Sequence, residues 1–153
     1  LPVATGAAAA LSALDVIEHV DDDTGALLEL ARVVRPGGTI VLTVPALPLL
    51  WSEWDVALHH RRRYTRRTLL RALRGLPVRV AHLSYINTAA LPPILAYRAL
   101  RQWGLRLGDG RLEDRVPGEP LNSILRRLFV TPALWRIPAP IGVSLLCVLR
   151  RES

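Results

Sequence analysis

Two clusters of polar or aromatic side chains follow stretches of the sequence that have strand character. The first is LDVIEHV, residues 14–20, which brings Asp15, Glu18 and His19 close together in the chain. The second begins at Pro45 and runs to Trp54. In open α/β sheets, ligands bind beyond the carboxyl ends of the strands. If the two strands are neighbours in one sheet, the two clusters converge on a single site.

A basic segment follows the second cluster. Residues 59–75 contain no acidic residue and seven arginines: Arg61, Arg62, Arg63, Arg66, Arg67, Arg71 and Arg74. Such a patch (residues 61–74) forms a solvated helix face, an anionic substrate or membrane contact, or a nucleic-acid contact. An apolar stretch at residues 89–100 comes after it, which is typical of peripheral membrane segments. We expect no nucleic-acid partner, because aromatic residues other than Tyr64 are missing from the patch.

The first part of the chain contains the clearest signals for regular structure. Residues 21–24 (DDDT) predict a helix start, because they combine capping side chains with negative charge at the positive end of the helix dipole. This helix should run to about Val34 and end at the Pro-Gly-Gly of residues 36–38. Residues 39–44 (TIVLTV) predict a strand buried on both faces. Residues 7–16 fit either a buried strand or a helix.

The rest of the chain continues to alternate between helix and strand. Thr65 is expected to cap a helix that runs to Arg74, with its leucines (Leu69, Leu70 and Leu73) directed inward. The other expected elements are a loop at 46–60, strands at 78–85 and 143–150, helices at 88–103 and 121–130, and a polar linker at 104–120. This alternation predicts an α/β sheet with helices on its faces.

The composition fits one domain, because half of the 153 residues are hydrophobic. The chain starts at Leu1 and contains no Met, so we interpret it as a fragment, a processed chain or the product of a misassigned start. The net charge of +7 equals the charge of the basic segment, since 13 arginines elsewhere balance 13 acidic residues. The single cysteine, Cys147, is expected to be buried and inert. We expect a cytoplasmic location, with membrane association as an alternative.

Several motifs, taken together, resemble a known enzyme family. LDVIEHVDDD (residues 14–23) and RVVRPGGTIVLTVPA (residues 32–46) are similar to the fourth-to-fifth-strand segment of class I S-adenosylmethionine-dependent methyltransferases. WSEWDVALHHRRRYTRRTL (residues 51–69) resembles the segment after the fifth strand in a bacterial subgroup, and GVSLLCVLRR (residues 142–151) the final antiparallel strand. The resemblance covers essentially the whole chain. It implies an α/β fold with a partial Rossmann-like sheet, containing the fourth to seventh strands with the last one antiparallel.

The resemblance also implies S-adenosylmethionine as the cofactor. Leu14, with Ala13 and Asp15 beside it, corresponds to residues that line the adenine or methionine region in this family. Glu18 and His19 correspond to the mouth of the site, on the substrate side. In some relatives an acid-x-x-Glu-His pattern binds a divalent metal, which suits Mg²⁺ or Mn²⁺. The alternative is that Glu18 and His19 cap the next helix, and we assign no metal from the sequence.

The resemblance suggests roles for the residues that follow the fifth strand. His60, and His19 across the site, are candidates for the group that takes a proton from the methyl acceptor. Methyl transfer depends mainly on in-line positioning, so His60 has an alternative role in packing the loop. Trp51, Trp54 and Tyr64 are candidates for the substrate-side wall, with anchoring of the loop as the alternative for the aromatic residues.

Two features of the family lie outside this sequence: the glycine-rich loop after the first strand and the acid that binds ribose. We therefore expect a truncated methyltransferase domain over residues 1–153, with a helical cover insertion at about 86–136 and a long apolar sheet edge. The expected function is methyl transfer to a small-molecule or lipid-linked acceptor, incomplete in this chain. The alternatives are a non-catalytic remnant of the fold and a basic module that contacts membranes.

Overall fold

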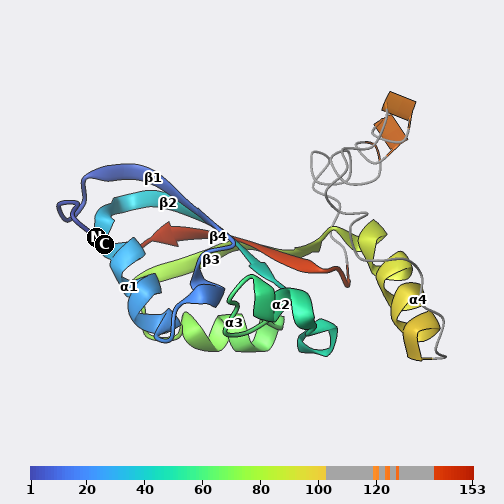
Figure 1. Ribbon diagram of the computed structural model, residues 1–153. Coiled ribbons are helices and arrows are strands. Elements are labelled where there is room, and N and C mark those ends of the chain that lie inside the picture. Colours follow the sequence, from blue (N-terminus) through green and yellow to red (C-terminus); the bar gives the residue numbers. More distant parts are fainter. Residues whose placement is uncertain (103–118, 121–122, 125–126, 128–139) are drawn as a thin grey trace.

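The chain forms a mixed four-stranded sheet, as the computed structural model in Figure 1 shows. The structure describes residues 1–102, 119–120, 123–124, 127 and 140–153. The strands are β1 (Ala8–Leu14), β2 (Val34–Pro45), β3 (Val78–Ile86) and β4 (Ser144–Arg151), in the order β1-β2-β4-β3. β1 is parallel to β2, and β4 is antiparallel to both β2 and β3. This confirms the predicted partial α/β sheet with an antiparallel last strand.

Two helices pack against the same face of this sheet. They are α1 (Asp23–Val33) and α3 (Arg66–Ala72), which lie side by side below the strands in Figure 1. The other helical segments are η1 (Ile17–His19), η2 (Pro48–Leu50), α2 (Glu53–Ala57), η3 (Thr88–Ala90) and α4 (Leu91–Gln102). The core is built from the inward side chains of the sheet and of these two helices, among them Ile40, Leu42, Val44, Leu145, Cys147, Leu149, Leu27, Ala31 and Leu69.

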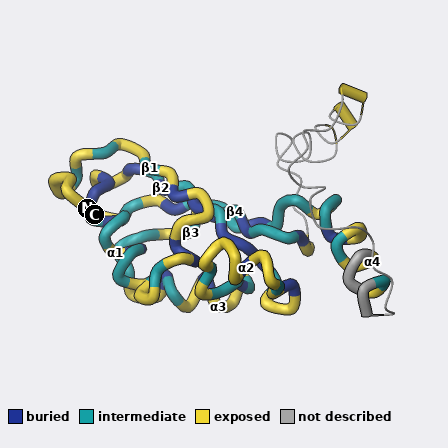
Figure 2. The backbone as a smooth tube through the Cα atoms, in the orientation of Figure 1, coloured by how far each residue is buried: buried dark blue, intermediate teal, exposed yellow. Residues whose placement is uncertain are grey.

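β2 differs from its prediction in how it is buried. Its side chains alternate along residues 38–44, with Ile40, Leu42 and Val44 fully buried and Thr39, Val41 and Thr43 half-buried. This is visible as the dark blue and teal stretches of the sheet in Figure 2. The expectation of burial on both faces was wrong, because α1 and α3 cover the same face of the strand.

The boundary between α1 and β2 also differs from the prediction. Asp22 caps α1 by accepting a hydrogen bond from the Gly25 N–H at 2.8 Å, as expected from the acidic run. The helix, however, ends at Val33, and the strand already begins at Val34. The Pro-Gly-Gly of residues 36–38 therefore lies inside the irregular start of β2, where Gly37 has a φ of +76°. A side chain at Gly38 would lie 2.7 Å from a carbonyl oxygen of β1, so this close approach requires glycine.

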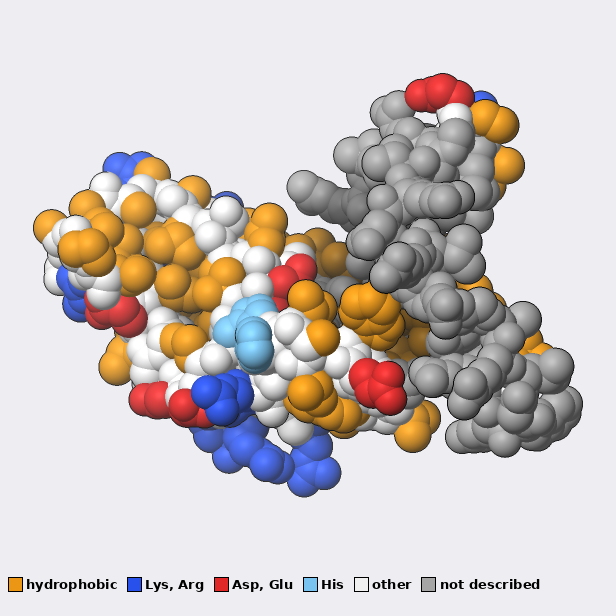
Figure 3. Space-filling view, viewed as in Figure 1, with side chains coloured by type: hydrophobic (Ala, Val, Ile, Leu, Met, Phe, Trp, Pro, Cys, Tyr) orange, Lys and Arg blue, Asp and Glu red, His pale blue; other side chains and the backbone are white. Residues whose placement is uncertain are grey.

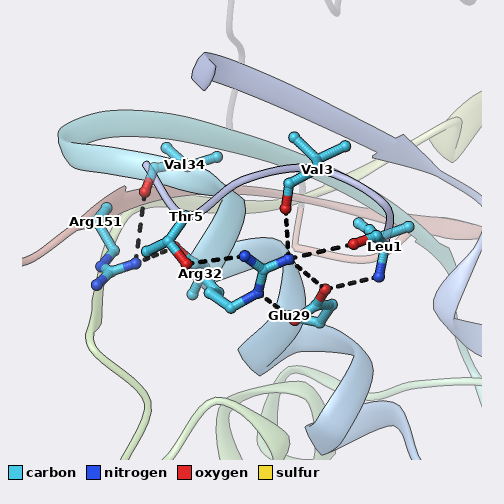
Figure 4. A network of polar contacts seen from close by, with 8 residues as sticks. Leu1, Val3, Thr5, Glu29, Arg32, Val34 and Arg151 are labelled. Atoms are coloured by element: carbon cyan, nitrogen blue, oxygen red, sulfur yellow. Dashed lines mark hydrogen bonds and ion pairs between the residues drawn. The ribbon is translucent and has the colours of Figure 1, made fainter. Parts of the chain in front are cut away.

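The carboxyl end of α1 is tied to neighbouring segments by two arginines (Figure 4). Arg32 donates hydrogen bonds to Thr5 Oγ1 at 2.9 Å and to the Val3 carbonyl at 2.8 Å, and it pairs with Glu29 at 2.7 Å. The hydrogen bonds to Glu29 lower the pKa of its carboxyl group to about 2. Arg151 donates to carbonyl groups at the carboxyl end of α1, where a cation is favourable for the helix dipole. These contacts attach residues 1–7 and the end of β4 to the same helix.

The remaining elements match the predictions in part. β1 resolves the ambiguity of residues 7–16 in favour of a strand, and β3 and β4 confirm the two later strands. Leu70 was expected in the core but is 44% exposed, because it lies roughly 100° around α3 from Leu69, which packs on the core. η3 and α4 confirm a helix that starts near Thr88. The predicted linker (104–120) and most of the predicted helix at 121–130 lie outside the described residues.

Cys147 lies on the inward face of β4 and is fully buried. Burial raises the pKa of its thiol to about 12, because the thiolate would lose its hydration. The prediction that this thiol is buried is confirmed.

Candidate functional site

The segments that follow β1 and β2 meet at the carboxyl edge of the sheet. The two strands are adjacent and parallel, so both segments leave the sheet at the same edge. The Arg61 N–H donates to the Glu18 carbonyl oxygen at 2.7 Å, and Ala46 forms an isolated bridge with Tyr64. The segment after β1 therefore meets the segment after β2 through residues 60–64, which follow the second predicted cluster.

The segment after β2 is organised around the buried carboxylate of Asp55. This residue lies in α2, with 1% of its surface exposed. It accepts hydrogen bonds from His60 Nδ1 at 2.9 Å, Arg63 Nε at 2.7 Å and the Ser52 N–H at 2.8 Å. Burial alone would raise the pKa of Asp55, but the hydrogen bonds from Arg63 and His60 outweigh this effect and lower it. An ionised Asp55 therefore holds His60 in a fixed orientation.

Glu18 is the second buried acid at this edge, and its surroundings differ from those of Asp55, which accepts three hydrogen bonds. It lies in η1 with no exposed surface, and neither of its carboxylate oxygens has a hydrogen-bond partner among the described residues. Burial raises the pKa of Glu18, and the nearby carboxylate of Asp15 raises it further. A buried, unpaired carboxylate is costly, so this side chain requires a proton or a cation.

The two histidines of the predicted site lie against each other. The ring centroids of His19 and His60 are 4.8 Å apart and the rings are nearly perpendicular. His19 Nε2 is 3.9 Å from the nearer Glu18 oxygen. The side chain of His19 is 40% exposed, whereas that of His60 is 11% exposed. The histidines at the surface appear in pale blue in Figure 3, above the basic patch.

The end of β1 carries the residues predicted to contact the cofactor. Leu14 is 55% exposed, and Asp15 is exposed with a φ of +51°, which turns the chain sharply away from the strand. The Asp15 N–H donates to Thr43 on β2, so this turn is fixed to the neighbouring strand. The Ala13 side chain lies in the core, which leaves only its backbone near the edge.

The three aromatic residues of the predicted substrate side fall into two groups. Trp51 and Trp54 flank Ser52 and Glu53 and are 41% and 50% exposed. Tyr64 is buried, with its ring in the core and its hydroxyl group donating to Asp23 Oδ2 at 2.9 Å. Burial raises the pKa of Tyr64 above its usual range. Tyr64 therefore holds the segment after α2 against α1 and lies away from the surface.

Comparison with known proteins gives the same fold. Residues 1–42 match the sequence profile of the methyltransferase domain family. A methyltransferase solved in complex with the Haloferax volcanii Trm112 activator superposes with a TM-score of 0.58, at 16% identity over 100% of this chain. Geranyl diphosphate C-methyltransferase from Streptomyces coelicolor, solved with Mg²⁺, geranyl diphosphate and S-adenosylhomocysteine, has a TM-score of 0.55 at 18% identity over 99% of this chain. The chain has a class I methyltransferase fold.

Within this methyltransferase fold, the chain corresponds to a part of each solved relative. It covers 58% of the Haloferax methyltransferase and 50% of the Streptomyces enzyme. A third relative, a methyltransferase from Bacillus halodurans, has a TM-score of 0.54 at 12% identity, and the chain covers 74% of it. No curated protein matches the sequence. At these identities the likeness establishes the fold, and it confirms the resemblance described from the sequence motifs.

The arginines of the basic patch divide into two kinds in the methyltransferase fold. Arg62 pairs with Asp23 at 3.2 Å and Arg63 with Asp55 at 2.7 Å, so both hold the site together. The exposed members are Arg61, Arg66, Arg67, Arg71 and Arg74. They contribute to the blue area at the lower edge of Figure 3. No described helix is long and apolar enough to cross a membrane.

Asp55 is the residue of this site that the sequence interpretation missed. The sequence does contain a signal for it, because Ser52 and Asp55 have the spacing of a capping box, and Asp55 accepts hydrogen bonds from the Ser52 N–H and hydroxyl. The expectation of a loop over residues 46–60 hid this short helix. His60 and Arg63 both donate hydrogen bonds to this carboxylate, which only the fold shows.

Proposed function

We propose that this chain forms the acceptor side and one wall of the cofactor site in an S-adenosylmethionine-dependent methyltransferase. The observation that carries the proposal is the meeting of the segments after β1 and β2 at one sheet edge, joined by the Arg61–Glu18 hydrogen bond. Ligand sites of open α/β sheets lie at this edge. Relatives with the same fold were solved with S-adenosylmethionine or S-adenosylhomocysteine, which supports the choice of cofactor.

The residues at the end of β1 fit one side of this cofactor. The exposed Leu14 offers apolar surface, and the adjacent Asp15 offers a hydrogen-bond acceptor. An adenosine or methionine group presents both kinds of surface. The backbone of Ala13 completes this wall. When bound, S-adenosylmethionine supplies a methyl group already activated on a sulfonium.

The histidines and tryptophans would act on the methyl acceptor. Asp55 accepts the Nδ1 hydrogen of His60, so Nε2 of His60 is left to take a proton from a hydroxyl or amine acceptor. His19, in contact with His60, is exposed on the same edge. Trp51 and Trp54 would wall the acceptor pocket. Positioning accounts for most of the catalysis, because in-line geometry is the main requirement of methyl transfer.

The acceptor that we propose is a small molecule or a lipid-linked molecule. The exposed arginines of the patch support a second candidate role, which is contact with an anionic membrane surface on the cytoplasmic side. A lipid-linked acceptor would unite the two roles, since the arginines belong to the same continuous segment, residues 51–74, as Trp51, Trp54 and His60.

Titration calorimetry with S-adenosylhomocysteine tests the proposal on the 153-residue chain. We expect saturable binding, with a Kd on the order of micromolar to tens of micromolar. Asp15→Asn keeps a side chain that tolerates the positive φ but removes the charge. This variant should bind at least 10-fold more weakly, because a hydrogen bond to a charged group contributes about 1.5–3 kcal/mol.

Asp21→Asn is the matched control, because it makes the same chemical change at an exposed acid whose ion pair with Arg61 is at the surface. Its affinity should equal that of the wild type. If the folded chain gives no binding heat at millimolar ligand, the alternative of a non-catalytic remnant replaces the proposal.

A further inference from the structure

Three potential metal ligands converge at the carboxyl edge of the sheet. The ligand atoms of Glu18, His19 and His60 all lie within 4.8 Å of one another. Glu18 and His19 come from the segment after β1, and His60 comes from the segment after β2. Asp15, which belongs to the acid-x-x-Glu-His pattern in the sequence, is not part of this cluster. The third ligand therefore comes from a distant part of the chain.

Glu18 is the observation that distinguishes this cluster from a chance grouping of polar residues. Its side chain is completely buried, and both oxygens lack a hydrogen-bond partner among the described residues. Buried polar atoms are nearly always paired, because the loss of hydration is otherwise uncompensated. Within the described part of the chain, the nearest basic atom is His19 Nε2 at 3.9 Å, which is too distant for a hydrogen bond.

His60 is held in the way that metal-binding histidines are held. Its Nδ1 donates to the buried carboxylate of Asp55 at 2.9 Å. Arg63 donates to the same carboxylate oxygen at 2.7 Å, and the backbone N–H of His60 donates to the Asp55 carbonyl at 2.8 Å. A carboxylate on one ring nitrogen fixes the tautomer and leaves Nε2 with its lone pair, which is the usual arrangement around ligating histidines.

We propose that Glu18, His19 and His60 bind a divalent transition-metal ion of the Zn²⁺ class. Two imidazoles and one carboxylate suit such ions, whereas Mg²⁺ and Ca²⁺ favour shells made of oxygen atoms. Metal–ligand bonds of about 2.0–2.2 Å place neighbouring ligand atoms roughly 3.3–3.6 Å apart in a tetrahedral shell. The cluster needs to contract by about 1.2–1.5 Å from its 4.8 Å limit to reach this spacing.

The exposure of His19 determines what kind of site this would be. With three protein ligands, a tetrahedral shell keeps one open position, as in catalytic rather than structural zinc sites. The partly exposed His19 side chain places that position at the surface of the sheet edge. Metal binding does not require methyl transfer. It would occupy the His60 nitrogen that otherwise acts as a base, so the two roles of His60 exclude each other.

The test uses Co²⁺ as a spectroscopic probe and Zn²⁺ as its competitor on the full 153-residue chain. We expect one Co²⁺ per chain, with visible ligand-field absorption that Zn²⁺ abolishes. His19→Ala and Glu18→Gln should each weaken Co²⁺ binding at least 10-fold, because the first removes a ligand and the second replaces an anionic ligand with a neutral amide. His59→Ala is the matched control, since His59 is an exposed histidine beside the cluster and outside it. Its affinity should stay within twofold of the wild type.

Melting temperature provides a second readout, which also covers a Glu18→Gln variant that fails to fold. Zn²⁺ should raise the Tm of the wild type and of His59→Ala, because a ligand that binds only the folded state stabilises it. It should not raise the Tm of His19→Ala, whose exposed side chain can be removed without opening the core. Absence of saturable Co²⁺ binding, or equal losses in His19→Ala and His59→Ala, would overturn the proposal. Neither result bears on S-adenosylhomocysteine binding, which Asp15→Asn tests separately.

Discussion

The two buried acids of the site, Glu18 and Asp55, meet the cost of burial in opposite ways. Asp55 receives hydrogen bonds from a histidine, an arginine and a backbone N–H, and its pKa is lowered despite burial. Glu18 receives none from the described residues, and its pKa is raised. The same functional group is therefore stabilised as an anion in one position and left in need of a proton or cation in the other.

Tyr64→Phe should make the folded chain less stable but also less sensitive to alkali. The variant loses the hydrogen bond to Asp23, which should lower the free energy of unfolding by about 1 kcal/mol near pH 8. The raised pKa of Tyr64 favours the protonated hydroxyl in the folded state. The stability that this raised pKa contributes is fully present below pH 10, the ordinary pKa of tyrosine, and is lost as the pH rises above that value. Urea unfolding at pH 8 and pH 11 measures both effects.

The wild type should lose more stability than Tyr64→Phe between these two pH values. Cys147 also has a raised pKa, but it is present in both proteins and its effect cancels in the comparison. Equal losses in the two proteins would show that the Tyr64 hydroxyl is not protected from ionisation in the fold.

At the residue scale, the sequence shows which side chains could take part in chemistry more readily than it shows whether they are buried. The spacing of Glu18 and His19 directed attention to them, and the structure places them at the expected edge. The burial of Tyr64 could not be read from the sequence, because its neighbours are arginines that are typical of a solvated surface. Its position depends on the bridge to Ala46 and the hydrogen bond to Asp23, which are both contacts between distant segments.

Among the secondary-structure elements, α3 shows how a short helix depends on its cap. Thr65 accepts a hydrogen bond from the Thr68 N–H at 3.1 Å, and the Thr68 hydroxyl accepts one from the Thr65 N–H at 2.8 Å. The helix contains only 7 residues, and isolated helices of this length are unstable. The cap and the burial of Leu69 therefore account for much of its stability.

Thr65→Ala should lower the free energy of unfolding by about 1 kcal/mol, because the first turn of α3 loses its side-chain acceptor. Thr65→Ser retains the oxygen and should remain close to the wild type. Urea denaturation of both variants measures the difference. A Thr65→Ser variant as unstable as Thr65→Ala would attribute the effect to the methyl group of Thr65 and not to the cap.

The elements themselves were largely predictable, but the α1–β2 boundary was not. The apolar and β-branched residues 39–44 indicated β2, and the acidic run indicated the start of α1. Pro36, Gly37 and Gly38 have the sequence of a helix stop. In the fold, the pairing of Val34 with Ala8 on β1 draws these residues into the strand. Pairing between strands took precedence over local preference here, and a local reading of the sequence cannot show such pairing.

At the scale of the molecule, five exposed arginines of the described residues lie on and beside α3. The basic segment contains seven arginines, of which Arg62 and Arg63 form ion pairs with Asp23 and Asp55. A concentrated charge of this kind attracts anionic surfaces over roughly the Debye length, about 8–10 Å at physiological salt. The strength of such attraction should depend on where the arginines are, and not only on their number.

Sedimentation with lipid vesicles tests the patch. We expect the chain to bind vesicles that contain phosphatidylserine and not vesicles of phosphatidylcholine alone. Replacing Arg67 and Arg71 with Gln should weaken binding roughly 30-fold, at about 1 kcal/mol for each arginine near the surface. Replacing the exposed Arg35 and Arg79 removes the same charge elsewhere and should have a smaller effect. Equal effects of the two double variants would contradict a role for the patch.

The alternation of strands and helices predicts the fold class of the molecule, but not the order of its strands. Residues 144–151 form β4 between β2 and β3, whereas the family resemblance implied only that this last strand is antiparallel. The periodicity of the sequence also gave no sign that the described helices next to the sheet share one face. That arrangement follows from the contacts of α1 and α3 with the core, which depend on the complete sheet.

The central position of β4 has a consequence for how the chain folds. Leu42 pairs with Cys147 and Val80 with Leu149, so residues far apart in sequence must meet before β3 gains any strand partner. Contacts of such long range slow folding, because the entropy of closing the intervening chain is lost before the contact forms. During synthesis β1, α1 and β2 can associate early, while β3 waits for residues 144–151 to leave the ribosome. The inner edges of β2 and β3 are therefore exposed together in the nascent chain, and that interval is when this protein is most open to mispairing.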